Sequence, residues 1–310
     1  PGVINLLHGR GAAVGDPVMA DSRLAGIHFT GSTGVFQGIW RSVAENLPNY
    51  AQYPRLVGET GGKDFVMALP DSDPRTLAVA LARGSFEYQG QKCSAASRAY
   101  VPKSIWPEVL EQLEAITAEM AMGDPEDFTN FLGAVIDEGS YKKLSTAIEG
   151  ARADASCKVV VGGECDASEG WFIRPTVIET ADPKHDLMRT ELFGPVLTIF
   201  PYEDARVDET VQLCADTSEY ALTGAVFGTN RTALRKAMET LRFAAGNFYV
   251  NDKPTGAVVG QQPFGGARAS GTNDKAGSIL NLLRWVSPRT IKETFVPPTD
   301  WRYPFLGKDD

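Results

Sequence analysis

The sequence predicts an α/β protein. Short apolar runs alternate with stretches of helical periodicity along most of the chain, which is the pattern that α/β folds produce. The 310 residues are 43% apolar and 22% charged, as in an ordinary globular protein. A chain of this length supplies about two domains. It can also bury a large core without disulfides or structural metals.

Strands are predicted where short apolar runs are bounded by glycine-rich or polar turns. They cover residues 26–30, 55–59, 159–161, 196–200, 221–226 and 248–250. The turn Gly31–Gly34 ends the first of these strands, and Thr60–Gly62 ends the second.

Helices are predicted where apolar residues recur at helical spacing. They cover residues 35–46, 73–88, 104–122, 139–153, 209–216 and 231–243. The second helix begins with Asp73 as its N-cap and Pro74 at the first helical position. One face of the third helix is apolar and carries Ile105, Val109, Leu113, Ile116 and Met120.

Three segments lack a regular pattern. Residues 251–277 are rich in glycine, and because apolar residues such as Phe264 interrupt them, we expect an ordered functional loop. Residues 9–15 resemble a dinucleotide-binding fingerprint, but the glycine spacing is off by one and no ribose-binding acid follows, so a turn is predicted. Residues 297–310 are expected to form an arm over the surface.

Charge and composition exclude several classes of function. With 30 Lys and Arg against 39 Asp and Glu, the net charge of −9 argues against a nucleic-acid or anionic-membrane partner. No apolar run approaches the roughly 18 residues of a membrane span. The four cysteines form no Cys-x-x-Cys pair, and the three histidines lie far apart. A disulfide framework, a metal site and a Ser-His-Asp triad are therefore not expected.

The best candidate nucleophile is Cys93. It lies in a gap between two predicted elements, after Gly90 and Lys92, where backbone N–H groups can point at a ligand atom. Glu59 ends a strand beside glycines 34 residues earlier and is the candidate base. The other cysteines are interpreted as small buried apolar residues: Cys157, Cys165 and Cys214.

Two turns are candidate ligand contacts. The turn Gly31–Gly34 stands between a strand and a helix, and its glycines and hydroxyls offer free N–H groups to a phosphate. The segment Glu191–Pro195 places an acid and an aromatic residue ahead of a strand, and by itself it is interpreted as a plain turn.

These segments, in this order, resemble the aldehyde dehydrogenase superfamily. The resemblance is carried by Phe29–Thr33, Gly58–Lys63, Gly90–Cys93 and Glu191–Pro195. Residues 86–96 and 247–275 resemble more closely its Δ1-pyrroline-5-carboxylate dehydrogenase branch, whose members oxidise glutamate γ-semialdehyde. The resemblance extends over essentially the whole chain.

The resemblance implies three parts of an aldehyde dehydrogenase fold. Residues 1–62 would be the carboxy-terminal part of a Rossmann-like NAD-binding domain, and residues 63–280 an α/β catalytic domain. Residues 281–310 would hold a C-terminal strand, at 289–295, and a tail that joins a homo-oligomer, a dimer or larger. The resemblance also implies that an amino-terminal part of the family's proteins is missing from this chain. That part supplies an oxyanion donor and adenosine contacts.

The resemblance assigns roles to individual residues. Cys93 would attack the aldehyde to give a thiohemiacetal, and Glu59 would activate the water that hydrolyses the thioester. Contacts to the cofactor NAD would come from Gly31, Ser32, Glu191 and Phe193. Contacts to the substrate would come from Ser94, Gly256, Ala257 and Phe264. No metal is implied.

The function that the resemblance implies is NAD-dependent oxidation of glutamate γ-semialdehyde to glutamate in proline catabolism. It also implies functional coupling to proline dehydrogenase, and a location in the cytoplasm or, in a eukaryote, in the mitochondrial matrix. Two alternatives stay open: a dehydrogenase for another aldehyde, and a truncated, non-catalytic assembly partner. The 310 residues alone are expected to be inactive.

Overall fold

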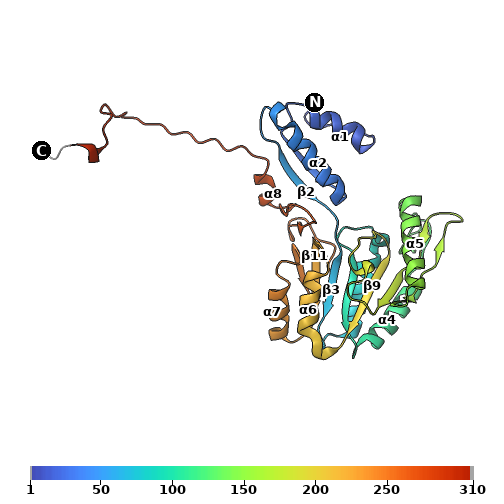
Figure 1. Cartoon of the computed structure of the whole chain (residues 1–310). Helices are drawn as coiled ribbons and strands as arrows, with labels where there is room; N and C mark the ends of the chain where they lie inside the picture. Colours follow the sequence, from blue (N-terminus) through green and yellow to red (C-terminus); the bar gives the residue numbers. More distant parts are fainter. Residues whose placement is uncertain (1, 308–310) are drawn as a thin grey trace.

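The chain folds into a small and a large part, each built around its own sheet (Figure 1). The computed structural model describes residues 2–307. In the small part, β1 (Gly26–Thr30) pairs in parallel with β2 (Arg55–Glu59). The helices α1 (Gly11–Ala20) and α2 (Thr33–Asn46) pack beside this pair. The chain enters the large part directly after β2.

The large part is a seven-stranded sheet in the order β12-β11-β3-β4-β9-β8-β5. Its strands are β3 (Asp64–Ala68), β4 (Ala96–Pro102), β5 (Cys157–Val161), β8 (Thr176–Thr180), β9 (Val196–Tyr202), β11 (Thr223–Phe227) and β12 (Asn247–Val250). All neighbours run parallel except β5, which is antiparallel to β8. Two small antiparallel pairs lie outside this sheet: β6 (Cys165–Asp166) with β7 (Phe172–Ile173), and β10 (Tyr220–Ala221) with β13 (Ala267–Arg268).

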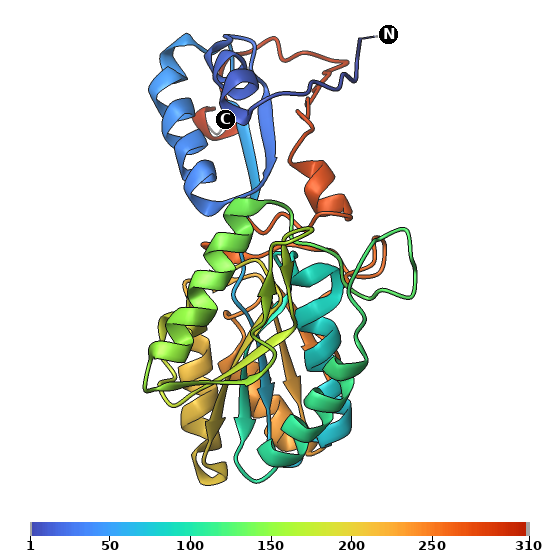
Figure 2. The same cartoon turned by 90° about the vertical axis from the view of Figure 1, so that its right-hand side faces the viewer.

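Helices cover both faces of the large sheet (Figures 1 and 2). They are α3 (Pro74–Phe86), α4 (Trp106–Glu119), α5 (Glu138–Ala153), α6 (Val207–Asp216) and α7 (Arg231–Thr240), with the short α8 (Ile279–Leu283) outside the sheet. Alternate residues of β3 enter two different cores: Val66 packs with α3 and α4, and Met67 packs with α6 and α7. A strand placed between two helical layers is buried on both faces.

Short 3₁₀ turns connect these elements. They are η1 (Leu47–Asn49), η2 (Glu87–Gly90), η3 (Asp186–Met188), η4 (Asp204–Arg206) and η5 (Pro304–Leu306).

The α/β class is confirmed, but β3, β4 and β8 are absent from the predicted strands. Every residue of β3 is buried, so it shows no alternation of apolar and polar residues. The ends of elements also shift slightly. For example, α4 covers 106–119 where the periodicity predicts 104–122.

The predicted turn at residues 9–15 is wrong, because α1 begins at Gly11. Three glycines in this stretch favour a turn by propensity, yet α1 packs against α2 and half-buries Val14 and Met19. Tertiary packing commonly overrides a helix propensity of this size.

The C-terminal arm also differs from its prediction. Residues 297–307 extend away from the body of the molecule instead of lying over it (Figure 1), and 308–310 are outside the described residues. Within this single chain, Phe295 and Trp301 find no apolar surface to cover them and stay exposed. The stretch 289–295 has no regular secondary structure here. Its pairing with a second copy therefore remains a prediction, as do the domain limits at 62 and 280.

Within residues 2–307, no helix has both the length and the apolar character needed to cross a lipid bilayer.

Candidate active site

The parallel strands of the large sheet bring three loops to one edge. Glu59, Cys93 and Glu191 each stand a few residues before the strand that follows them, β3, β4 and β9. Because these strands are parallel neighbours, the three preceding loops meet at the amino end of the sheet. The small part of the chain lies directly beyond this end (Figure 2).

A cavity of about 820 Å³ lies at this junction. All ten residues predicted for the site line it: Gly31, Ser32, Glu59, Cys93, Ser94, Glu191, Phe193, Gly256, Ala257 and Phe264. The structure thus brings together residues that are more than 230 positions apart in the sequence. Their chemical roles remain predictions.

Cys93 sits on a loop with a rare backbone conformation. Tyr88, Gln89 and Gly90 have φ values of 53°, 55° and 62°, all in the left-handed region. A conformation of this kind persists only where surrounding contacts impose it. The side chain of Gln89 donates to the carbonyl of Ala134, and that of Gln91 accepts from the N–H of Ile136. These bonds hold the nucleophile loop against residues 134–136.

The surroundings of Cys93 favour its protonated thiol. Burial, and after it the nearby carboxyl groups of Asp64, Glu59 and Glu191, together raise the pKa of Cys93 to about 12. A thiol is a poor nucleophile until it loses its proton. The site therefore needs a base, or an added positive charge, before Cys93 can attack.

Glu59 is the candidate base for a water molecule in this cavity. Burial raises its pKa to about 7, although a backbone N–H of Gly266 and the charge of Lys275 oppose the shift. Among the described residues, Glu59 Oε1 is buried without a hydrogen-bond partner. A carboxylate with a pKa near neutrality and a free oxygen is suited to accept a proton.

The backbone of Glu59 is held by the glycine-rich segment. Gly271 pairs with Glu59 in an antiparallel bridge, and the N–H of Thr60 donates to Ser270 O at 2.9 Å. Gly271 has a φ of +133°, and a Cβ there would lie 2.1 Å from Gly58 O. Only glycine allows this close approach. The expectation of an ordered loop at 251–277 agrees with these contacts.

Glu191 and Phe193 line a different part of the cavity. Glu191 Oε1 accepts from the N–H of Gly62 at 2.9 Å, and burial raises the pKa of its carboxyl group. Phe193 adopts a left-handed conformation with φ of 61° and leaves its ring partly exposed. The carboxyl and the ring thus both line the cavity a few residues before β9.

Ser32 lies at the start of α2. Its hydroxyl accepts from Val35 N as the N-cap of this 14-residue helix. Gly31 and Ser32 both line the cavity, so the positive end of the helix dipole lies at its wall. This arrangement suits the phosphate of a dinucleotide. The carboxyl of Glu191, facing the same cavity, suits ribose hydroxyls as an acceptor.

Some residues that line the cavity are absent from the predicted site residues. Ser140 and Lys143 come from the start of α5, which reaches the junction of the two parts (Figure 2), and Thr255 precedes the predicted glycine. No local motif marks Lys143. The fold alone brings this cation close to Glu191.

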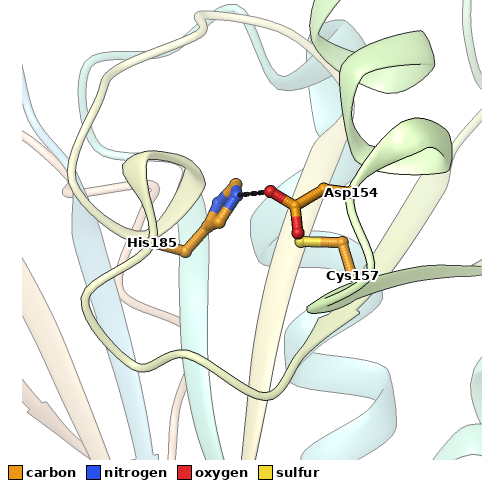
Figure 3. A group of neighbouring side chains, drawn as sticks. All are labelled: Asp154, Cys157 and His185. Atoms are coloured by element: carbon orange, nitrogen blue, oxygen red, sulfur yellow. Dashed lines mark hydrogen bonds and ion pairs between the residues drawn. The ribbon is translucent and has the colours of Figure 1, made fainter.

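A group of potential metal ligands lies elsewhere, at the end of α5. One ligand atom each from Asp154, Cys157 and His185 lies within 4.8 Å of the others (Figure 3). His185 Nδ1 accepts from Leu187 N at 3.1 Å, which leaves the ring proton on Nε2, facing Asp154. The Nε2 lone pair that a metal would need is thus not free. The hydrogen bonds account for this group without a metal.

Comparisons with known proteins agree with this geometry. Residues 1–291 match a family model described as "Aldehyde dehydrogenase family". The curated "Delta-1-pyrroline-5-carboxylate dehydrogenase, mitochondrial" of Dictyostelium discoideum is 53% identical over 307 residues, covering 98% of this chain and 55% of that protein. The chain thus spans about half the length of the curated relatives it matches.

Solved structures show the same likeness. The Δ-pyrroline-5-carboxylate dehydrogenase of Mycobacterium tuberculosis bound with NAD superposes with a TM-score of 0.92 at 55% identity, covering 99% of this chain and 56% of that one. Proline Utilization A (PutA) of Bradyrhizobium japonicum superposes with a TM-score of 0.80 at 30% identity, covering 88% of this chain and 27% of that one.

Proposed function

The chain belongs to the aldehyde dehydrogenase family, and on this premise we propose that it carries the catalytic machinery of an NAD-dependent glutamate γ-semialdehyde dehydrogenase. The observation that carries the proposal is the convergence of Cys93, Glu59 and Glu191 on one cavity that also includes Gly256 and Ala257. The relatives from Dictyostelium and Mycobacterium, which bear the name of this activity, support it.

The chemistry divides between Cys93 and Glu59. Once Cys93 has lost its proton to solvent water, its thiolate attacks the aldehyde carbon, forming a C–S bond and an oxyanion that the Cys93 backbone N–H can stabilise. Bound NAD would accept the hydride that leaves this carbon, so that the substrate becomes a thioester. Glu59 then takes a proton from water, the resulting hydroxide attacks the thioester, and the C–S bond breaks. The products are the carboxylic acid and the free Cys93 thiolate.

The residues present fit the cofactor. The start of α2 at Ser32 offers N–H groups to a phosphate, Glu191 offers its carboxyl to ribose hydroxyls, and Phe193 offers its ring to the nicotinamide. These contacts would hold the nicotinamide end near Cys93.

Gly256 and Ala257 suit a substrate that ends in a carboxylate. Gly256 has a left-handed φ of +84°, and its backbone lines the cavity beside Ala257. Successive backbone N–H groups next to a left-handed residue can bind anions. Glutamate semialdehyde carries its carboxylate beyond the aldehyde, and this favours an amino-acid semialdehyde over a plain alkyl aldehyde.

The relatives also suggest an assembly, a coupled reaction and a cellular location for this protein. We infer a homo-oligomer that uses residues 289–295, and coupling to proline oxidation, as the likeness to Proline Utilization A suggests. The curated eukaryotic relatives are named as mitochondrial, so a eukaryotic source would place this protein in the mitochondrial matrix and a bacterial source in the cytoplasm.

The test is an assay of the complete protein, meaning this chain with any sequence that accompanies it in its source. Formation of NADH is followed with glutamate γ-semialdehyde and, separately, with butanal. We expect a much higher kcat/KM for the semialdehyde. Equal values for both would leave the dehydrogenase activity standing and contradict the substrate. No NADH from either aldehyde would contradict the activity.

A further inference from the structure

Two loops are joined at the wall of the cavity. The nucleophile loop (residues 87–94) carries Cys93, and the anchor loop (residues 253–257) carries Gly256 and Ala257. The hydroxyls of Ser94 and Thr255 are hydrogen-bonded at 2.7 Å, and both side chains are buried. Either hydroxyl can be the donor, and the bond joins the anchor loop to the nucleophile loop one residue after Cys93.

Lys253 supplies a second link between the loops. Its ammonium donates to the carbonyl of Thr255 at 3.0 Å and lies 3.7 Å from the Glu87 carboxylate. The same Glu87 oxygen accepts from Lys92 at 3.0 Å, one residue before Cys93. The side chain of Lys253 is only 16% exposed, so these contacts are well shielded from water.

The backbone around Lys253 is also fixed. A Cβ at Gly84 of α3 would lie 3.5 Å from Lys253 Cβ and from Pro254 Cδ, so the anchor loop rests on this helix. A Cβ at Gly256 would lie 2.7 Å from Lys253 Nζ. The ammonium thus stands directly beside the residue that exposes its backbone to the cavity.

The surroundings of the anchor loop contain more cations than carboxylates. Around the anchor loop, Arg83, Lys92 and Lys253 surround the single carboxylate of Glu87. The acidic groups near Cys93 are those of Glu59, Asp64 and Glu191. A substrate whose carboxylate lies at the anchor loop and whose aldehyde lies at Cys93 matches this arrangement.

We propose that Lys253 is a specificity-determining residue for the carboxylate end of the substrate. Its ammonium fixes the Thr255 carbonyl, which orients the N–H groups of Gly256 and Ala257. Its positive charge also favours an anion bound there. This inference deepens the proposed function and rests on it, because it concerns the substrate of the same site.

The experiment compares Lys253→Met with Lys253→Arg in the complete protein. We expect Lys253→Met to raise KM for glutamate γ-semialdehyde about tenfold, the equivalent of one charge-assisted hydrogen bond. KM for butanal and both kcat values should change by less than about twofold, and Lys253→Arg should recover most of the loss. The matched control is Lys236→Met, at an exposed lysine that pairs with Asp208 on the protein surface.

A purely structural role for Lys253 predicts a different result. If Lys253→Met raises KM for the semialdehyde and for butanal by the same factor, or raises neither KM, the inference is wrong. Glu87→Gln provides a second variant, because it removes the competing carboxylate and leaves the bond from Lys253 to Thr255 O. We expect it not to raise KM for the semialdehyde, and a rise selective for the semialdehyde would overturn the proposal.

Calorimetry of L-glutamate binding separates the two proposals, since glutamate carries the same carboxylate and needs no turnover. If the complete, unmodified protein forms no NADH, the proposed function is wrong. If glutamate then binds to the unmodified protein about tenfold more tightly than to Lys253→Met, the role of Lys253 stands. If glutamate binds equally to both, or to neither, that role is wrong.

Discussion

At the scale of single residues, the site is a set of carboxyl groups around a buried thiol. Lys63 and Asp64 come directly after the turn that follows Glu59, and both are buried. Burial lowers the pKa of Lys63 to about 7, and it raises the pKa of Asp64 well above its usual value. Arg98 lies beside them and donates to Lys63 O at 2.7 Å. A carboxyl group with a raised pKa carries less negative charge near neutral pH, and Arg98 is positively charged. The net negative charge near Cys93 is therefore smaller than the number of acidic residues suggests.

Replacement of Cys93 by alanine should abolish NADH formation. The variant loses the nucleophile but keeps Gly31, Ser32 and Glu191, so NAD binding should persist. Activity and NAD affinity are measured on the same preparation. Cys157→Ala is the control, since this cysteine is half-buried outside the cavity and should leave the rate unchanged. Residual turnover of the Cys93 variant would exclude it as the nucleophile.

Replacement of Glu59 by glutamine should stop the reaction after hydride transfer. A rapid burst of about one NADH per site should precede a slow steady state, because the thioester accumulates. In the unmodified protein, hydrolysis needs the deprotonated carboxylate, so the steady-state rate should rise with pH and level off above about 7. The variant should lose this rise. An unchanged pH profile would mean that Glu59 is a structural residue.

At the scale of elements, the glycine-rich segment locks β2 in place. Thr272 N donates to Gly58 O at 2.9 Å, and Thr272 Oγ1 accepts from Gly58 N at 3.0 Å. Arg284, just after α8, forms an ion pair with Asp274 at 3.0 Å and also donates to Leu56 O. Segments more than 200 residues apart therefore hold the strand that ends at Glu59.

Gly271→Ala tests this lock. A Cβ at this position would meet Gly58 O at 2.1 Å, and the φ of +133° is unsuited to alanine. We expect a loss of about 2–4 kcal/mol in the free energy of unfolding, together with reduced activity. Chemical denaturation measures the loss. Gly38→Ala in α2 is the matched control, because nothing lies within 4 Å of its Cβ and it should gain about 0.5–1 kcal/mol. Equal effects at both glycines would contradict the close approach.

At the scale of the whole molecule, the small part of the chain has a small apolar core. It consists of two helices on a two-stranded sheet. Among the described residues, its apolar cluster contains three buried residues, Leu24, Val43 and Leu56. Trp40 and Tyr53 remain exposed on the same part.

Residues 1–310 expressed alone should therefore aggregate and form NADH at least about 10²-fold more slowly than the complete protein. A loss of this size is expected for the lack of one oxyanion donor, such as the donor that the family resemblance places outside these residues. Light scattering after gel filtration and an NADH assay with glutamate semialdehyde measure both properties. Turnover within tenfold of the complete protein would show that these residues suffice for the reaction.

The sequence by itself determined the helices α2 to α7 and the candidate chemistry, but not α1 or α8. The periodicity of α4 and α5, the N-cap at Asp73 and the glycine-bounded positions of Glu59 and Cys93 are local features that a short window reveals. The resemblance rests on such local motifs, and the family match agrees with it.

Only the tertiary structure decided which strands form the centre of the sheet and which residues meet. β3 and β4 are covered on both faces, so burial erased the alternation that would have marked them. Lys143, Thr255 and Lys253 carry no local signal, because their roles depend on contacts with loops far away in the sequence. The pKa of Glu59 likewise follows from burial. Burial and proximity are sums over long-range contacts, and a local pattern does not contain them.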